Sequence, residues 1–195
     1  MNYTLIGSLT SPYVRKIRLL LHGTPFELKI VNYLEEAGND YLRSINPVNK
    51  LPVLIDGNRT ILDSRIIFNY LSKKNNWVPF TIEEENILTA IDGAMDSTIN
   101  LFMLARGGLD LNCGNAFVER QTARIPHILE SLTPWVKTLD HKNPTHWNFL
   151  TISLYCFLYW AEFRKMYNLE NHPEMKQFLE NFKDAPGVAE TSIPV

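Results

Sequence analysis

The chain has few of the residues that support redox, metal or phosphate-loop chemistry. Its 195 residues include only two cysteines, Cys113 and Cys156, which form no Cys-x-x-Cys pair and make at most one disulfide. The five histidines show no spacing typical of metal ligands, so we expect no metal site. A glycine-rich phosphate loop is also missing, because Gly7 stands alone and Gly107-Gly108 lacks the required companions.

Excess charge and long apolar runs are missing as well. Nineteen Lys and Arg against 21 Asp and Glu give a net charge of -2, which offers no electrostatic reason to bind nucleic acid or an anionic membrane. The most apolar stretch, residues 149–161, is too short and too mixed to span a bilayer. The amino terminus shows neither a positively charged leader nor a cleavage pattern, so we expect a cytoplasmic protein.

The composition is that of a folded protein, and the pattern along the chain divides it in two. Short β-like runs alternate with helical patterns over residues 1–74, which predicts an α/β domain of order β-α-β-α-β-β-α. The strands are expected at 3–7, 27–32, 53–55 and 60–62, and the helices at 12–22, 39–44 and 64–72. After a polar linker at 73–80 we expect an all-helical domain over residues 82–195, with helices at 82–106, 115–138, 148–167 and 173–183.

A hydroxyl lies at the hinge between the expected first strand and first helix. Ser11 is a favoured helix N-cap, and Pro12 suits the first helical turn. Ser11 is therefore expected at the positive end of a helix dipole, a place suited to an anion such as a thiolate.

Three segments in order resemble a known family. They are Ser-Pro-Tyr-Val-Arg-Lys-Ile-Arg at 11–18, Asn-Pro-Val-Asn-Lys-Leu-Pro-Val-Leu at 46–54 and Asp-Ser-Arg at 63–65. Their order and spacing are similar to the thioredoxin-like amino-terminal domain of the glutathione transferases, and the resemblance continues through 92–96 and 151–154. It is closest to small bacterial members that use serine. It implies a thioredoxin-like domain followed by a helical domain, glutathione as co-substrate, and a homodimer.

The resemblance also implies roles for the first two segments. Ser11 would donate its hydroxyl proton to the glutathione sulfur, whereas the simpler interpretation is that it only caps its helix. The Leu51-Pro52 bond would be cis, and the backbone of Leu51 would pair with the cysteinyl backbone of glutathione as an added strand does. Without the family pattern, the simpler interpretation is that Pro52 is an ordinary trans proline at the first position of an edge strand.

The third segment and one lysine complete the expected glutathione site. Ser64 looks like a helix N-cap that would bind the γ-glutamyl carboxylate, with Asp63 just outside the helix and suited to the neighbouring ammonium. As a lone dipeptide, Asp63-Ser64 would be only a helix cap. Lys50 is the candidate for the glycyl carboxylate, or else a solvated surface charge. Arg15 and Arg18 are expected to support the fold through salt bridges.

The electrophile is expected to lie against the helical domain. The candidates recur at helical spacing on or near one face: Met95, Ile99, Phe102, Met103 and Arg106. The alternative is that this stripe is plain core. If part of it lines a cleft, its methionines favour loose acceptance of hydrophobic substrates.

The predicted function is conjugation of glutathione to a small hydrophobic electrophile. Glutathione-dependent peroxide reduction is an alternative that the same thiolate would support. A second alternative is a non-enzymatic protein-interaction module, because fold does not fix function. A thiol-disulfide oxidoreductase is disfavoured because position 11 is serine and neither cysteine lies near the expected thiol site.

Overall fold

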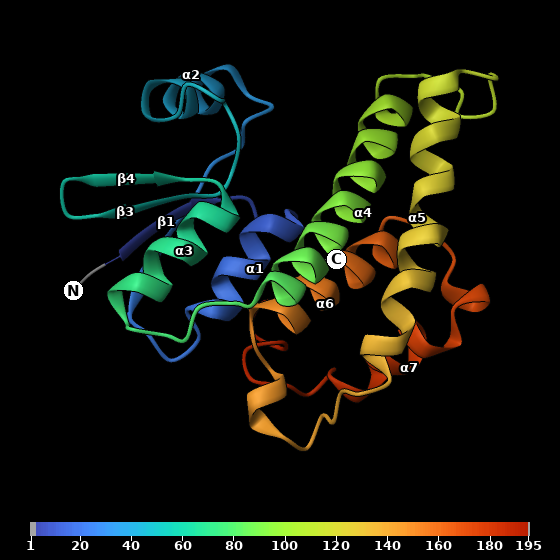
Figure 1. The fold of residues 1–195 in the computed structure, drawn as a ribbon. Helices are drawn as coiled ribbons and strands as arrows, with labels where there is room; N and C mark the ends of the chain where they lie inside the picture. Colours follow the sequence, from blue (N-terminus) through green and yellow to red (C-terminus); the bar gives the residue numbers. More distant parts are fainter. Residues whose placement is uncertain (1–2, 195) are drawn as a thin grey trace. The chain divides into compact units, whose positions relative to one another are not determined.

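The computed structural model describes residues 3–194, which form two compact units (Figure 1). The first unit comprises the chain up to Pro79 together with the segment from Pro186 onward, and the second comprises residues 80–185. The end of the chain thus differs from the expected division, in which the helical domain ran to residue 195. Residues 186–194 pack with the first unit instead.

A four-stranded mixed sheet organises the first unit, with strand order β2-β1-β3-β4. The strands are β1 (Tyr3–Gly7), β2 (Phe26–Ile30), β3 (Val53–Asp56) and β4 (Arg59–Leu62). Strand β1 runs parallel to β2 and antiparallel to β3, and β3 pairs antiparallel with β4 through a tight turn. The β-α-β-α-β-β-α order and the β3-β4 hairpin expected from the sequence are confirmed.

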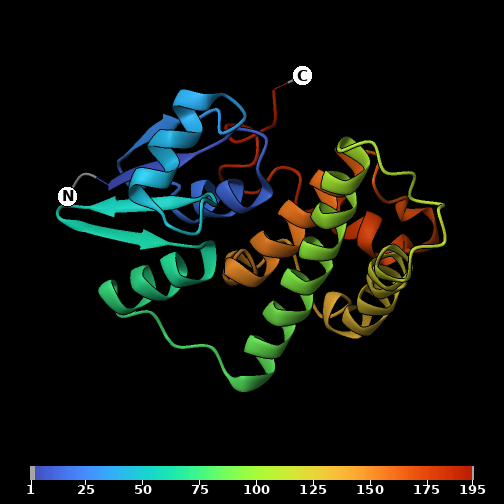
Figure 2. The same ribbon diagram turned by 90° about the horizontal axis from the view of Figure 1, so that it is seen from above.

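Three helices cover the two faces of this sheet: α1 (Pro12–Leu20), α2 (Glu36–Ile45) and α3 (Ser64–Lys74). Helices α1 and α3 lie together on one face, and α2 covers the other (Figures 1 and 2). Under α2, the buried side chains of Ile6, Val31, Leu42 and Val53 form one apolar cluster. The sheet is therefore a rigid support with packed side chains on each face.

Two arginines of α1 hold the end of the chain against the first unit. Arg15 is buried, and it donates hydrogen bonds to the Thr191 hydroxyl and to the Val188 carbonyl, both at 3.2 Å. Arg18 donates to the carbonyls of Glu190 and Thr191 at 2.9 and 3.3 Å. These hydrogen bonds go to backbone carbonyls and a hydroxyl. The salt bridges expected for these arginines stay a prediction.

The second unit is helical, as expected. Its helices are α4 (Ile82–Arg106), α5 (Ala116–Val136), α6 (Phe149–Phe163) and α7 (Pro173–Asn181), with single 3-10 turns η1 (Pro144–His146) and η2 (Leu169–Asn171). Helix α6 is buried around most of its circumference, and α4 packs against both α5 and α6. By length and composition alone α4 is able to cross a membrane, which is weak evidence because core helices of soluble proteins meet the same criterion.

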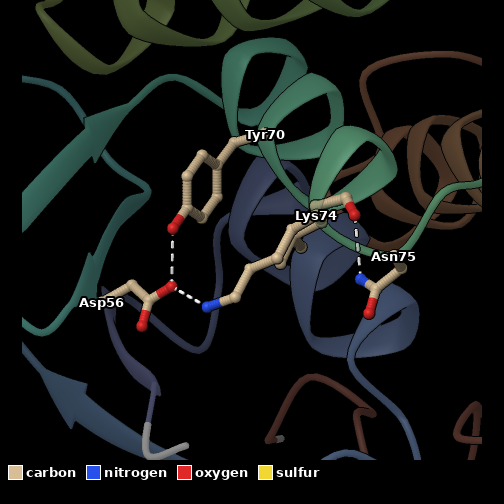
Figure 3. A network of polar contacts seen from close by, with 5 residues as sticks. Asp56, Tyr70, Lys74 and Asn75 are labelled. Atoms are coloured by element: carbon tan, nitrogen blue, oxygen red, sulfur yellow. Dashed lines mark hydrogen bonds and ion pairs between the residues drawn. The ribbon is translucent and has the colours of Figure 1, made fainter.

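A charged network joins the far end of β3 to the last turns of α3 (Figure 3). The carboxylate of Asp56 accepts a hydrogen bond from the Tyr70 hydroxyl at 2.6 Å and forms an ion pair with the Lys74 ammonium. These two donors, Lys74 first, lower the pKa of Asp56, and the carboxylate in turn raises the pKa of Lys74. The network therefore links α3 to the β3-β4 hairpin.

Replacing Asp56 with asparagine is expected to destabilise the protein near neutral pH but not in acid. Because the pKa of Asp56 is lowered on folding, its stabilisation is present above the unfolded value of 3.8 and is lost as the pH falls through the folded value. The difference in urea midpoint between wild type and Asp56→Asn should therefore shrink from about pH 7 to about pH 3. An equal difference at both pH values would contradict this, and Tyr70→Phe serves as a control that keeps the ion pair.

Candidate functional site

Strand pairing brings the three sequence segments to one end of the sheet of the first unit. Ile6 near the end of β1 pairs with Val53 at the start of β3, and Val53 also pairs with Leu62 at the end of β4. The residues that follow β1, precede β3 and follow β4 therefore meet at the same end. These are the residues around Ser11, Leu51 and Asp63, while the Asp56 network lies at the opposite end of β3.

Ser11 caps α1 as expected. Its backbone is extended, and its Oγ accepts a hydrogen bond from the Val14 N–H at 3.3 Å. Within residues 3–194 the Ser11 hydroxyl donates no hydrogen bond. The cap uses a lone pair of Oγ and leaves its proton for another acceptor, so capping and binding of an anion are compatible.

A glycine sets how closely α1 approaches the sheet. A Cβ on Gly7 would lie 2.4 Å from Cγ1 of Val14, the residue whose N–H binds Ser11. Any side chain at position 7 therefore displaces the turn that carries Ser11. The position of the hydroxyl depends on this close contact between β1 and α1.

The second segment presents unpaired backbone groups. The Leu51-Pro52 peptide bond is cis, as the resemblance implied. Pro52 is buried and Leu51 is half-buried. In the described part of the chain, the N–H and C=O of Leu51 make no hydrogen bond. A buried or half-buried backbone group normally has a partner, so this residue is suited to pairing with the backbone of a bound peptide.

Asn46 was not assigned a role from the sequence, yet it holds the loop that leads to Leu51. It is buried, its Oδ1 accepts from the Val48 N–H at 2.9 Å, and its Nδ2 donates to the Lys50 carbonyl at 2.6 Å. An asparagine whose side chain bonds to the backbone two residues later is a common turn device, and the Asn-Pro pair was the available signal. Asn46 is therefore a positioning residue.

Replacing Asn46 with alanine is expected to cost about 1–3 kcal/mol of stability, because two part-buried hydrogen bonds to backbone groups are lost, each of roughly 0.5–1.5 kcal/mol. Binding of glutathione is expected to weaken about fivefold as the Leu51 backbone moves, which corresponds to about 1 kcal/mol. Thermal unfolding and titration calorimetry measure the two effects. Asn39→Ala is the matched control, because it removes only an exposed 2.9 Å hydrogen bond from Asn49 in the same loop. Equal losses in the two variants would contradict the role of Asn46.

The third segment corrects one expectation from the sequence. Asp63, and not Ser64, is the N-cap of α3, because its Oδ1 accepts from the Arg65 N–H at 2.8 Å. Asp63 takes a positive φ of 68°, a conformation that residues other than glycine rarely adopt. Ser64 is the first residue of the helix and is buried, and its hydroxyl makes no hydrogen bond within the described residues. An anion at this helix end would meet a free hydroxyl and unpaired N–H groups.

Lys50 is exposed at the same end of the sheet. Its ammonium makes no hydrogen bond or ion pair among residues 3–194. In the acidic loop before α2, the side-chain amide of Asn32 donates a hydrogen bond to the Glu35 carboxylate at 2.7 Å. Lys50 therefore stays the candidate for a terminal carboxylate.

The five residues of the expected electrophile stripe on α4 differ in how far they are buried within the second unit. Met95 is fully buried, Ile99 and Phe102 are half-buried, and Met103 and Arg106 are exposed. The ring of Phe102 packs edge-on against Trp160 of α6, with centroids 5.2 Å apart. The later part of the stripe is thus the part that reaches the surface.

The metal-ligating and cysteine side chains of the described residues are arranged as follows. Among residues 3–194 there is no group of three or more His, Cys, Asp or Glu side chains able to hold a metal ion. Neither cysteine forms a disulfide: Cys113 is exposed on the loop after α4, and Cys156 is buried in α6.

Comparison with known proteins gives a consistent result. Residues 5–79 match the model of the glutathione S-transferase amino-terminal domain. The chain is 26% identical to an uncharacterized GST-like protein, YibF of Escherichia coli K12, over 97% of this chain and 98% of that protein. Two solved structures share the fold: a Methylobacterium radiotolerans glutathione S-transferase in complex with glutathione sulfonate, and a Pseudomonas fluorescens Pf-5 family member with bound glutathione. The first has a TM-score of 0.83 at 22% identity and covers 100% of this chain and 95% of its own. The second has a TM-score of 0.80 at 23% identity and covers 99% and 100%.

Proposed function

The chain belongs to the glutathione S-transferase family, and on that premise we propose that it binds glutathione at the Ser11 end of its sheet and conjugates it to small hydrophobic electrophiles. The observation that carries the proposal is that unused hydrogen-bonding groups gather there. They are the proton of the Ser11 hydroxyl, the backbone of Leu51 and the hydroxyl of Ser64, and none of these makes a hydrogen bond with a donor or acceptor among residues 3–194.

Each part of glutathione has a partner of matching chemistry. The thiolate accepts the Ser11 proton at the positive end of α1, and the cysteinyl backbone pairs with Leu51. The γ-glutamyl carboxylate lies at the amino end of α3 beside Ser64, and its ammonium pairs with Asp63. Lys50 takes the glycyl carboxylate.

Catalysis then needs little beyond positioning and stabilisation of charge. A free thiol of this kind ionises near pH ~8.5, and a pKa lower by one unit needs only about 1.4 kcal/mol. A hydrogen bond to a charged group supplies roughly 1.5–3 kcal/mol and a helix end roughly 0.3–1 kcal/mol. Ser11 is therefore a stabiliser of the thiolate and not a covalent nucleophile.

Titration calorimetry of the purified protein with glutathione and then with S-hexylglutathione tests this function. We expect both to bind, the alkylated ligand more tightly because its tail meets an apolar surface. Binding of neither would contradict the proposal and favour the interaction-module alternative, for which the next experiment is a search for partners. A second copy of the chain stays a predicted partner, to be tested by light scattering.

A further inference from the structure

A recess of about 540 Å³ opens at the β3-β4 hairpin, at the end of β3 opposite to the Ser11 segment. Two residues of the hairpin and three of the last turns of α3 line it: Asp56, Arg59, Tyr70, Lys73 and Lys74. All five belong to the first unit. The volume is within the range of about 300–1,000 Å³ that is typical of small-molecule sites.

One cation of this recess already has an acidic partner. The Lys74 ammonium and the Tyr70 hydroxyl both meet the same oxygen of Asp56, its Oδ2, as Figure 3 shows. The side chain of Asp56 is 14% exposed and that of Lys74 is 24% exposed, so the ion pair is largely shielded from water. The one negative charge of the recess is therefore balanced by Lys74.

The other two cations have no partner. The side chains of Arg59 and Lys73 are exposed, and neither makes a hydrogen bond or ion pair among residues 3–194. Lys74 first and then Tyr70 lower the pKa of Asp56 through hydrogen bonds, whereas Arg59, opposite Asp56 in the β3-β4 register, acts on it only through its charge. With three cations and one carboxylate, the recess carries two positive charges in excess.

The helix end explains only one of these two charges. Lys73 lies in the last turn of α3, where a positive charge is favourable beside the helix dipole whatever else it contacts. Arg59 is the first residue of β4 and has no such reason to be positive. Its guanidinium is a planar fork of N–H donors that matches two oxygens of one phosphate, and a lysine ammonium suits phosphate as a point charge.

We propose that this recess binds a small phosphate monoester, with the phosphate between the Arg59 guanidinium and the Lys73 ammonium and the organic part against the ring of Tyr70. The second pKa of such a phosphate is about 6, so at neutral pH it is mostly a dianion and matches the excess charge. Because the recess and the Ser11 segment lie at opposite ends of β3, a bound ester leaves the glutathione end free. The inference therefore goes beyond the proposed function and does not rest on it.

Titration of the full chain with phenyl phosphate at about pH 7.5, followed by phosphorus NMR, tests this inference. We expect Arg59→Gln and Lys73→Gln each to raise Kd about three- to fivefold, as for partly exposed ion pairs. Arg43→Gln is the matched control, because it removes an exposed positive charge from the last turn of α2 in the same unit, and it should leave Kd nearly unchanged. Benzenesulfonate, which has a similar shape and a single charge, should bind about threefold more weakly or less.

Four results would overturn the inference. They are no binding of phenyl phosphate, equally tight binding of benzenesulfonate, equal losses in Arg59→Gln and Arg43→Gln, and a loss in Lys50→Gln in place of Arg59→Gln. The last result would put the phosphate at the Ser11 end of the sheet. Thermal unfolding shows whether each variant is folded, and Lys73→Gln decides if Arg59→Gln is not. Failure of S-hexylglutathione to bind would contradict the proposed function and leave this inference standing.

Discussion

Replacing Ser11 with alanine is expected to raise the pKa of bound glutathione by about one to two pH units, because the thiolate loses a hydrogen bond of roughly 1.5–3 kcal/mol. The thiolate fraction at neutral pH then falls about 10- to 100-fold. Part of this is offset because a more basic thiolate is more nucleophilic, so kcat is expected to fall about 3- to 10-fold. The ultraviolet difference absorbance of the thiolate measures the pKa, and the pH profile of kcat reports the same group.

The same substitution removes a helix cap, at a cost of about 1 kcal/mol. Ser11→Thr separates the two roles, because it keeps both the oxygen that accepts from Val14 and the proton that would reach sulfur. We expect this variant to hold the wild-type pKa and Ser11→Ala to lose it. An alanine variant that lowers only the unfolding temperature would show that the hydroxyl is a cap and nothing more.

Much of this site follows from local sequence. The cap at Ser11 is predicted by a serine followed by a proline. The strand positions are predicted by short apolar runs between turn residues. Both patterns are local properties of the sequence. The β3-β4 hairpin follows from its turn residues, whereas the pairing of β1 with β3, which brings the three segments together, joins residues about 50 positions apart and is seen only in the structure.

What the sequence did not predict depends on contacts between distant residues or on backbone angles. Asp and Ser are about equally good caps, so residue type alone does not decide which of them begins α3, and the structure shows that Asp63 accepts from the Arg65 N–H. The last residues have no apolar periodicity of their own, and they fold where Arg15 and Arg18 donate hydrogen bonds to their carbonyls.

Replacing Asp63 with asparagine is expected to weaken glutathione binding about tenfold while leaving the pKa of the bound thiol near its wild-type value. A charge-assisted hydrogen bond to the γ-glutamyl ammonium is lost, and about 1.4 kcal/mol corresponds to a factor of ten in Kd. Asparagine is the informative choice because its side-chain oxygen still accepts from the Arg65 N–H. It also tolerates the positive φ of this position better than most residues. Calorimetry measures Kd, and thermal unfolding should be nearly unchanged.

The two variants together test the division of roles within the site. Ser11→Ala should change the pKa of the thiol and barely change Kd for S-hexylglutathione, which has no ionisable thiol. Asp63→Asn should weaken both glutathione and S-hexylglutathione by the same factor, because both ligands carry the same ammonium group. If Ser11→Ala weakened S-hexylglutathione as strongly as Asp63→Asn does, the hydroxyl would be holding the peptide. The assignment of thiolate stabilisation to Ser11 would then be wrong.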